Sequence, residues 1–329
     1  MKRARIIGLG SYVPERVLTN SDLEKMVDTS DAWIVTRTGI RERRIAAPDE
    51  ATSDMGFAAA QRALKAAGVE PGDVDLVLIA TLTPDYTTPN TASLIQHRLE
   101  AHRAAAFSIE VACVGFIAAL SLAKAYVEAG IYRRVLVIAA DKLSSVTDYT
   151  DRATCVLFGD GAAAAVVADA GAGLLIHHVC LGSDGGQANL LMVPAGGSRE
   201  PASEKTVREK RHCLAMEGQE VFKHAVRRME GATHECLERT GWSQSQIDWL
   251  IPHQANDRIL EAVSRRFEIP GDRMVNTLHK YGNTSSSGLG IALDELVSEG
   301  KVAQGHRIVL VAFGGGFTWG GATLESVEA

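Results

Sequence analysis

Two segments of the chain follow the same plan, and this internal repeat restricts the folds open to the sequence more than any other feature. Residues 63–80 and 236–253 each begin as the end of a helix, continue through a capping glycine and a short polar loop, and finish in an apolar strand that follows an aspartate. The interval between the two capping glycines equals the interval between the two aspartates (241 minus 68 and 248 minus 75 are both 173), and we call it the repeat interval. A duplicated unit of this kind predicts an α/β protein with two similar halves.

A second correspondence lies further along each half. The helix expected after Cys113 ends at a glycine, and so does the helix expected after Asn283, at the same distance along the chain (130 minus 113 equals 300 minus 283). If the halves, residues 1–172 and 173–329, are related by pseudo-twofold symmetry, Cys113 and Asn283 begin equivalent helices that can face each other. His253 ends the repeated strand of the second half, and ligand sites in such sheets lie at the carboxyl ends of strands.

Cys113 is a candidate nucleophile. It lies in the apolar, strand-like run 109–116, which passes directly into a segment with helical spacing and composition. A thiol at a helix N-terminus is favoured in its thiolate form by the unpaired N–H groups and the positive end of the helix dipole, and the thiolate is the nucleophile. Taken alone, a cysteine in an apolar run is more often a small buried side chain.

His253 and Asn283 offer two neutral hydrogen-bond donors. The imidazole follows an apolar strand that Pro252 interrupts, and the amide lies between small residues that let a substrate approach closely. Together they can form an oxyanion site, and the glycine run 314–316 can form a second one with the N–H of Cys113. Each feature taken alone also fits a structural role, as a hydrogen-bonded strand end or a turn. The glycine run lacks the spacing of a dinucleotide-binding fingerprint.

The composition excludes several classes of partner and site. A formal net charge of −6 and an aromatic content of 5% argue against nucleic acid. The five cysteines include no Cys-x-x-Cys pair, which argues against disulfides or a structural zinc and favours a reducing cytoplasm. The N-terminus becomes strand-like at once, without the features of a signal peptide, and no stretch is long and apolar enough to span a membrane. We therefore expect a soluble cytoplasmic protein without a metal site.

Several motifs, in the same order and nearly from end to end, resemble the thiolase superfamily and most closely its β-ketoacyl-acyl-carrier-protein synthase III family. The motifs that carry the resemblance are residues 28–43, 112–116, 158–162, 253–256, 282–285 and 313–320. The resemblance implies a five-layer αβαβα fold with two pseudo-symmetric halves, and a homodimer. It also implies decarboxylative Claisen condensation of an acyl-coenzyme A primer with malonyl-acyl-carrier protein. The products would be 3-oxoacyl-acyl-carrier protein, coenzyme A and CO2, at the start of type II fatty acid synthesis.

The resemblance gives the reactive residues distinct roles. Cys113 takes the acyl group from acyl-coenzyme A, which is a substrate, so no cofactor is expected. His253 and Asn283 hold the enolate that forms when malonyl-acyl-carrier protein loses CO2. The backbone N–H groups of Cys113 and Gly315 hold the tetrahedral oxyanion, and Phe313 forms an apolar wall that favours loss of the malonyl charge as CO2.

The resemblance also implies three groups of binding residues. Trp33 and Arg152 sandwich the adenine of coenzyme A, Arg37 lies near its phosphates, and Asn256 and Gln219 line the pantetheine tunnel, although the family has asparagine at the position of Gln219. The acyl pocket comprises Thr88, Leu143 and Phe158, and the docking surface for an acidic carrier protein comprises Lys223, Arg258, Arg265 and Arg266. Without the resemblance, Trp33 reads as a helix core residue and the arginines as surface charges.

Three features depart from the family. Glu110, three residues before the cysteine, would raise the pKa of the thiol if it pointed inward, and we expect it instead at the dimer interface. Thr88 stands where some members have phenylalanine, and the smaller side chain leaves room for longer or branched primers. The polar stretch 195–212 is longer than expected and is either a mobile lid or a solvated loop.

Two other functions stay open at this point. A specialised enzyme of secondary metabolism could use the same Cys–His–Asn set to condense or transfer acyl groups. Turnover of malonyl-acyl-carrier protein, compared with malonyl-coenzyme A or amine acceptors, separates it from the first function. A non-catalytic partner of carrier proteins could have kept the fold, and labelling of Cys113 by acetyl-coenzyme A distinguishes that case.

Overall fold

The computed structural model of the chain describes residues 2–328, whose main sheet has nine strands in the order β11-β12-β13-β8-β1-β7-β6-β4-β5. The first half contributes strands β1 (Arg5–Tyr12), β2 (Val17–Thr19), β3 (Glu42–Arg44), β4 (Leu76–Ala80), β5 (Ala105–Ile109), β6 (Arg134–Asp141) and β7 (Gly161–Ala168), and helices α1 (Asn20–Leu23), α2 (Asp31–Thr38), α3 (Thr52–Ala67), α4 (Thr91–Arg98) and α5 (Gly115–Glu128). The second half contributes strands β8 (Gly173–Ser183), β9 (Leu191–Met192), β10 (Ala215–Met216), β11 (Trp249–Pro252), β12 (Arg307–Gly314) and β13 (Thr318–Val327), and helices α6 (Glu204–Arg208), α7 (Gly218–Thr240), α8 (Asp257–Arg266), α9 (Leu278–Tyr281) and α10 (Gly288–Ser298). Within residues 2–328, no helix has both the length and the apolar character needed to cross a membrane.

The strand order repeats in the two halves of the sheet. In the first half β4 and β6 are parallel, and β7 and β1 follow as antiparallel neighbours. β11, β12, β13 and β8 have the same order and the same directions in the second half. β5 adds a parallel strand beside β4, and a parallel bridge between Leu250 and Met274 lies at the corresponding place beside β11. The repeat in the sequence is thus a repeat of topology, and we propose a boundary between residues 172 and 173, immediately before β8.

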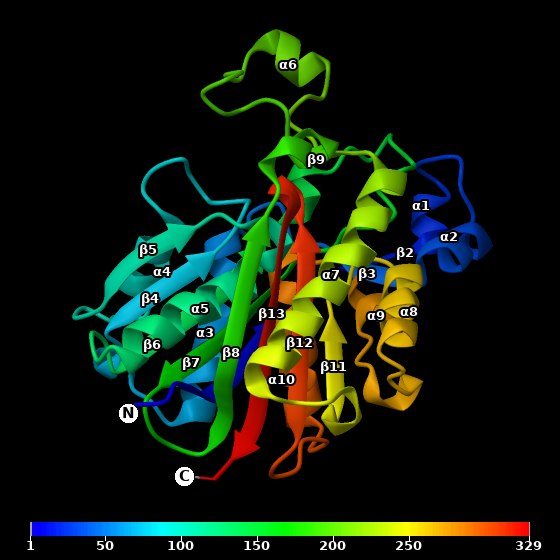
Figure 1. Cartoon of the computed structure of the whole chain (residues 1–329). Helices are drawn as coiled ribbons and strands as arrows, with labels where there is room; N and C mark the ends of the chain where they lie inside the picture. Colours follow the sequence, from blue (N-terminus) through cyan, green and yellow to red (C-terminus); the bar gives the residue numbers. More distant parts are fainter. Residues whose placement is uncertain (1, 329) are drawn as a thin grey trace.

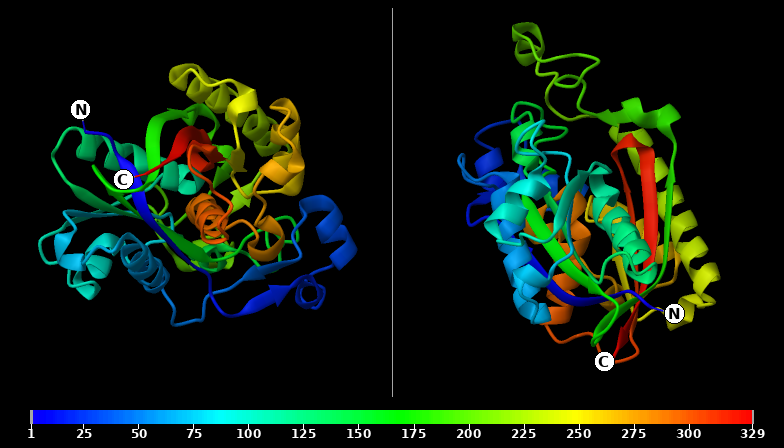
Figure 2. Two further views of the ribbon diagram at one scale, coloured as in Figure 1. Left: turned by 90° about the horizontal axis from the view of Figure 1, so that it is seen from below. Right: turned by 90° about the vertical axis from the view of Figure 1, so that its left-hand side faces the viewer.

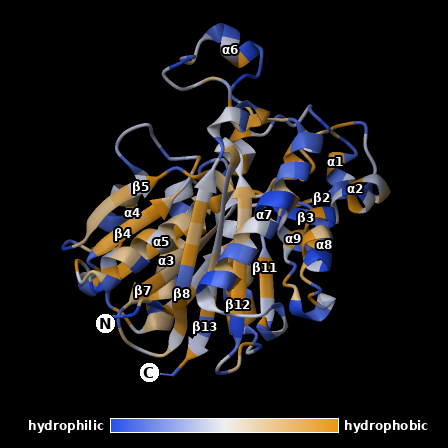
Figure 3. Cartoon of the chain, viewed as in Figure 1, coloured by the Kyte–Doolittle hydropathy of each residue, from blue (hydrophilic) through white to orange (hydrophobic). Residues whose placement is uncertain are grey.

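Five layers, in the order αβαβα, enclose three buried cores. α5 and α10 lie between the two halves of the sheet and pack with residues of both, such as Leu78 and Leu310 (Figures 1 and 2). α3 and α4 cover the outer face of the first half, and α7 and α8 cover that of the second. Along β4, Leu78 faces the central core and Ile79 faces an outer one. β4 is apolar throughout, and β6 and β12 are apolar except at their ends, as expected of strands buried on both faces (Figure 3). The expected five-layer fold is confirmed.

The central helices α5 and α10 begin at equivalent places. α5 begins at Gly115 and α10 at Gly288, which are separated by the repeat interval (288 minus 115 is 173). A 3-10 turn precedes each helix, and each turn opens with a residue in the left-handed region, Ala112 with φ 43° and Ser285 with φ 54°. The two turns therefore share one backbone conformation.

Ser286 is the structural counterpart of Cys113, at the same repeat interval (286 minus 113 is 173), whereas Asn283 lies three residues earlier (286 minus 283). The expectation that Cys113 and Asn283 precede equivalent helices is confirmed, but the equivalence of the two residues themselves is wrong. The distances to the two terminal glycines are equal in the sequence because α10 has 11 residues and α5 has 14.

Residues 193–214 form a hairpin that projects from the body of the molecule, with α6 at its tip (Figure 1). The Arg211 guanidinium donates two hydrogen bonds to Glu200, at 2.7 and 2.6 Å, and the N–H of Ala195 donates to the Arg211 carbonyl at 2.8 Å. β9 and β10 pair at the base of the hairpin. The long polar stretch of the sequence therefore has a folded conformation with its own contacts.

Candidate active site

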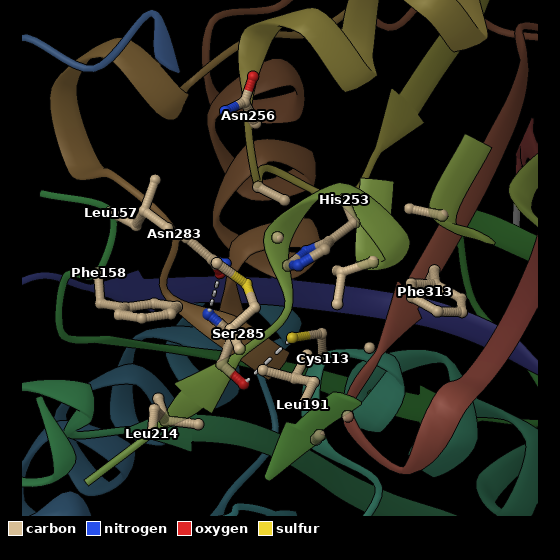
Figure 4. A pocket seen from close by; sticks show the side chains of 18 of the residues that line it. Cys113, Leu157, Phe158, Leu191, Leu214, His253, Asn256, Asn283, Ser285 and Phe313 are labelled. Atoms are coloured by element: carbon tan, nitrogen blue, oxygen red, sulfur yellow. Dashed lines mark hydrogen bonds between the residues drawn. The ribbon is translucent and has the colours of Figure 1, made fainter. Parts of the chain in front are cut away.

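A cavity of about 590 Å³ draws its lining from both halves of the chain (Figure 4). Cys113 reaches it from the turn before α5, His253 from the end of β11, and Asn283 from the segment before α10. Most of the other lining side chains are apolar, and a volume of this size suits a small-molecule substrate. Residues 2–328 contain no group of three His, Cys, Asp or Glu side chains arranged to hold a metal ion.

Cys113 is a buried thiol. Its pKa is raised from 9.0 to about 11, chiefly by burial and also by the carboxylate of Asp141. Hydrogen bonds from the Ser285 hydroxyl and from the backbone N–H groups of Gly315 and Cys113 act in the opposite direction. The thiolate expected from the helix N-terminus is therefore not the resting form, because loss of hydration outweighs the donors around the sulfur. The two backbone N–H groups nevertheless converge at the sulfur, where an oxyanion could also be held.

The glycine run at the end of β12 lies directly against the cysteine. A Cβ atom on Gly314 would lie 2.6 Å from the Cβ of Cys113, 2.9 Å from its backbone nitrogen and 3.1 Å from its sulfur. A Cβ atom on Gly315 would be less crowded, at 3.3 Å from the Cβ of Ala112. The absence of a side chain at Gly314 is what lets the backbone approach the thiol so closely.

His253 is buried and neutral. Its backbone N–H donates to the carbonyl of Val311 at 2.8 Å, which fixes the chain just beyond β11. Burial lowers the pKa of the imidazole from 6.5 to about 4, so the ring carries no charge at pH 7. Its Nδ1 atom is buried and has no hydrogen-bond partner within residues 2–328. A buried ring nitrogen in this state is suited to a ligand that supplies the missing partner.

Asn283 is held rigidly by the backbone around it. Its N–H donates to the carbonyl of Leu157 at 2.8 Å, and its carbonyl accepts from the N–H of Gly159 at 3.0 Å. Its side-chain Oδ1 accepts from the N–H of Ser285 at 2.9 Å (Figure 4). Because the oxygen of the amide is engaged there, the Nδ2 group is the donor that the side chain can offer to a ligand.

Phe313 supplies an apolar wall. The ring is 3% exposed and packs edge-on against Phe317, with the ring centres 5.1 Å apart at an interplanar angle of 81°. It lines the same cavity as Cys113 and His253. A rigid aromatic surface beside two neutral donors creates a site that disfavours an anionic carboxylate.

Residues from α2 and from the start of α8 line the exposed end of the cavity. Trp33, Arg37 and Asn256 belong to this group, and the Nδ2 of Asn256 donates to the Arg37 carbonyl at 3.2 Å. The Arg152 guanidinium carbon lies 5.1 Å from the centre of the Trp33 ring, and that of Arg37 lies 5.8 Å from it. Arg152 itself does not line the cavity and donates to the carbonyl of Asp28 at 2.8 Å.

Thr88 and Gln219, like Arg152, do not line the cavity of the single chain. Leu143 and Phe158 line the cavity, whereas Thr88 is exposed on the loop after β4 and does not. One chain does not place Thr88 in the acyl pocket, and its assignment there stays a prediction. Gln219 is likewise exposed on the first turn of α7, where Gly218 and Val221 line the cavity, and its assignment to the tunnel wall stays a prediction.

The four basic residues expected to dock a carrier protein are exposed on α7 and α8, namely Lys223, Arg258, Arg265 and Arg266. Three of them lie within 4 Å of a carboxylate on the same or a neighbouring helix. Arg258 instead lies beside α2, where its guanidinium donates to the carbonyl of Thr36 at 3.2 Å. Through this hydrogen bond Arg258 contacts α2, the helix that carries Trp33 and Arg37 at the exposed end of the cavity.

Glu110 is exposed and lines the cavity beside Ala112 and Cys113. Its expected place at a dimer interface stays a prediction. The carboxylate that raises the pKa of Cys113 is nevertheless Asp141, second to burial among the causes that raise it. Burying the thiolate charge raises the pKa of the thiol more than a carboxylate exposed to solvent does, because water screens the charge of that carboxylate.

Sequence reasoning missed several residues of the site. Ser285 donates a hydrogen bond to the sulfur of Cys113 at 3.7 Å, although the sequence marked it only as a neighbour of Asn283 (Figure 4). Leu191, from β9 at the base of the projecting hairpin, and Leu214, at the end of the hairpin, also line the wall. The repeat interval pairs Cys113 with Ser286, one residue after Ser285, so it points to this turn and not to the donor itself; nothing local in the sequence marks the two leucines.

The chain is similar along its whole length to proteins of one family. The family models described as 3-oxoacyl-[acyl-carrier-protein (ACP)] synthase III and as the C-terminal part of the same protein match residues 107–185 and 237–326. The beta-ketoacyl-[acyl-carrier-protein] synthase III of Chlamydia muridarum is 54% identical over 326 residues, covering 99% of this chain and 100% of its own.

Solved structures agree along the whole chain. The 3-oxoacyl-[acyl-carrier-protein] synthase III from Aquifex aeolicus VF5 superimposes with a TM-score of 0.90 at 44% identity, covering 98% of this chain and 99% of its own. The priming beta-ketosynthase from the R1128 polyketide biosynthetic pathway has a TM-score of 0.91 at 38% identity and covers 99% of this chain and 97% of its own.

Proposed function

The chain belongs to the 3-oxoacyl-[acyl-carrier-protein] synthase III family, and from this premise we propose that it condenses an acyl-coenzyme A primer with malonyl-acyl-carrier protein. The products are 3-oxoacyl-acyl-carrier protein, coenzyme A and CO2, which makes the reaction the initiating step of type II fatty acid synthesis. The observation that carries the proposal is the convergence of a thiol, a neutral imidazole and an oriented amide, from Cys113, His253 and Asn283, on one cavity.

In the first step the sulfur of Cys113 attacks the thioester carbonyl of acyl-coenzyme A. The new bond joins this sulfur to the acyl carbon, the bond to the coenzyme A sulfur breaks, and the thiol proton leaves with coenzyme A. The N–H groups of Cys113 and Gly315, which converge at the sulfur, are suited to hold the intermediate oxyanion. Because burial raises the pKa of Cys113 to about 11, the thiol is the main form that meets the substrate.

In the second step the malonyl thioester loses CO2. The electron pair of the broken carbon–carbon bond passes into an enolate, whose oxygen accepts hydrogen bonds from His253 and from the Nδ2 of Asn283. Both donors are uncharged, since burial holds the pKa of His253 at about 4. The wall at Phe313 favours departure of the carboxylate as neutral CO2. The enolate carbon then attacks the acyl group on Cys113, and the sulfur leaves as thiolate, which takes up a proton from water to restore the thiol.

The exposed end of the cavity is suited to coenzyme A. Trp33 and Arg152 offer an aromatic face and a guanidinium for the adenine, and Arg37 is a donor for its phosphates. A base stacked between two partners requires about 7 Å, so Arg152 must move outward from its position 5.1 Å above Trp33. Asn256 lies along the path that pantetheine takes inward.

The remaining parts of the proposal concern partners and setting. The exposed lysine and arginine side chains on α7 and α8 suit an acidic carrier protein. Among them, Arg258 contacts α2, which lines the exposed end of the cavity. β5 forms the edge of the nine-stranded sheet, and an edge strand can pair with a second copy in a homodimer. Cysteines that are all free fit a reducing cytoplasm. The chemistry needs no cofactor, because the substrates carry the reactive thioesters.

A condensation assay with purified full-length chain tests the proposal. Acyl-coenzyme A and malonyl-acyl-carrier protein should give stoichiometric CO2 and 3-oxoacyl-acyl-carrier protein, detected by mass spectrometry, and Cys113→Ala should abolish condensation. Turnover that prefers malonyl-coenzyme A or an amine acceptor would instead identify the specialised acyltransferase of secondary metabolism. The chain is 38% identical to the polyketide enzyme and 54% identical to the Chlamydia muridarum synthase, and the lower identity to the polyketide enzyme weakens that alternative.

A further inference from the structure

One turn of the backbone contacts two of the reactive groups. Ser285 donates its hydroxyl to the sulfur of Cys113 at 3.7 Å and its backbone N–H to Oδ1 of Asn283 at 2.9 Å (Figure 4). Its φ of 54° lies in the left-handed region, which is costly for a residue with a side chain and persists only where the surroundings impose it. A small movement of this turn therefore displaces both the donor to the thiol and the amide that faces the substrate.

A buried carboxylate fixes this turn from behind. Asp141, at the end of β6, is fully buried, and its Oδ2 accepts from the backbone N–H of Ser286 at 3.1 Å and from its hydroxyl at 2.6 Å. Its Oδ1 accepts from the N–H of Leu82 at 2.8 Å and the hydroxyl of Thr81 at 3.1 Å. Burial raises the pKa of Asp141 above 3.8, and hydrogen bonds from Ser286, Leu82 and the Ser285 side chain oppose the rise. Each oxygen accepts a backbone N–H, an arrangement that the ionised carboxylate fits.

The pseudo-twofold relation places Asp141 and Ser286 at positions equivalent to Gly314 and Cys113. Gly314 corresponds to Asp141 at the repeat interval (314 minus 141 is 173), and it lies against Cys113 as Asp141 lies against Ser286. In one half a glycine leaves room beside a cysteine, and in the other a carboxylate locks a serine in place. A Cβ on Gly115 would lie 3.0 Å from the Cβ of Ser286, so the locked turn rests against the start of the helix that follows Cys113.

We propose that Ser285 is a further catalytic residue, whose hydroxyl donates to the Cys113 sulfur when it is a thiolate, and that Asp141 is the positioning residue that holds the turn for it. The proposal rests on Cys113 being the nucleophile named above. The donor acts twice: when the thiol proton is lost for acyl transfer, and when the bond between the acyl carbon and the sulfur breaks and its electron pair stays on sulfur.

The charges that face Cys113 set the background for the test. Asp141 lies behind the turn, and Glu110, His253 and Arg37 line the cavity. Burial and Asp141 raise the pKa of the thiol, and the Ser285 hydroxyl opposes them. Removing that hydroxyl must therefore raise the pKa further.

The experiment measures the rate of Cys113 alkylation by iodoacetamide as a function of pH in the full-length protein, with the modified peptide identified by mass spectrometry. Ser285→Ala should slow alkylation about tenfold at pH 8 and raise the midpoint by about one pH unit. Ser287→Ala is the matched control, because Ser287 lies in the same buried turn but donates to the carbonyl of Thr284 at 2.9 Å. Its profile should equal that of the unmodified chain, and an unshifted Ser285→Ala profile would overturn the proposal.

Asp141→Asn separates positioning from charge because the two roles have opposite signs. Loss of the negative charge alone would lower the pKa of Cys113 and speed alkylation, whereas release of the turn should slow it as Ser285→Ala does. Combining Asp141→Asn with Ser285→Ala should add little to either alone. Faster alkylation of Asp141→Asn would remove the positioning role.

Two further measurements distinguish a folding defect from a loss of positioning, and a failure of the proposed function from a failure of the Ser285 assignment. If Asp141→Asn does not fold, Ser286→Ala removes one donor to the carboxylate and should slow alkylation in the same direction. An unchanged profile for Ser286→Ala would then overturn the positioning role. If the unmodified chain takes no acyl group from acyl-coenzyme A while the Ser285→Ala shift is observed, the proposed function fails and the hydrogen-bond assignment stands.

Discussion

Gly314→Ala tests the claim that the site depends on the backbone of β12 lying against the cysteine. Gly314 has φ −163° and ψ −168°, an extended conformation open to alanine, so any effect arises from space alone. The added methyl carbon would lie 2.6 Å from the Cβ of Cys113 and 2.9 Å from its backbone nitrogen. A normal carbon–carbon contact is about 3.5 Å or more, so the two chains must separate by about 0.9 Å.

The separation moves both the sulfur and the N–H that is suited to an oxyanion. A displacement of about 1 Å at a reacting group costs on the order of 10²-fold in rate, and overpacking costs about 1–3 kcal/mol of stability. Gly314→Ala should therefore lower the rate of Cys113 acylation about 100-fold in a protein that still folds. Stopped acylation reactions analysed by intact-protein mass spectrometry measure the rate, and urea unfolding measures the stability.

Gly8→Ala is the control, because it creates an equal overlap away from the cavity. Its methyl carbon would lie 2.5 Å from the backbone nitrogen of Ala67, where β1 packs on α3. It should lower stability to a similar extent and leave the acylation rate of the folded protein unchanged. An unaffected rate in Gly314→Ala, or an equal loss in folded Gly8→Ala, would refute the reasoning.

Three other predictions concern the donors, the pH dependence and the docking surface. Asn283→Asp replaces the Nδ2 donor with a carboxylate oxygen, so release of CO2 from malonyl-acyl-carrier protein should fall by about 10²- to 10³-fold while Cys113 is still acylated; loss of acylation as well would contradict separate roles. Because burial lowers the pKa of His253 from 6.5 to about 4, the unfolded chain binds a proton that the folded chain does not, and stability should fall by up to about 3 kcal/mol as the pH drops through this range. Urea titrations of His253→Asn should lack that slope, and an unchanged slope would contradict the assignment. Arg258→Glu should raise KM for malonyl-acyl-carrier protein more than for the acyl-coenzyme A primer, and equal effects in steady-state kinetics would remove the docking role.

The repeated segments predicted the topology because the features that define them depend only on residues close together in the sequence. Capping glycines, polar loops and buried strands are local, so the repeat interval transfers directly to the matching strands of the two halves. The same rules could not reveal that α10 is shorter than α5, and this difference shifted the apparent partner of Cys113 from Ser286 to Asn283.

The state of the nucleophile was the part of the site that local reasoning predicted wrongly. A helix N-terminus favours a thiolate, but whether it prevails depends on how much water the fold removes around Cys113, and here burial is the larger effect. Ser285 and Asp141 were missed for the same reason, because their roles arise from contacts between segments that lie far apart in the chain. The position of Thr88 outside the cavity is also a property of the assembled fold.

The central claim is that Cys113 carries the primer and passes it to the decarboxylated malonyl group, and a pulse and chase measures this directly. The full-length chain is incubated with isotopically labelled acetyl-coenzyme A, digested and examined by mass spectrometry, and a second sample is chased with malonyl-acyl-carrier protein. The account predicts label on the peptide that contains Cys113, and its loss in the chase together with labelled 3-oxoacyl-acyl-carrier protein and CO2. Label on another residue, or label on Cys113 that the chase does not remove, would contradict it.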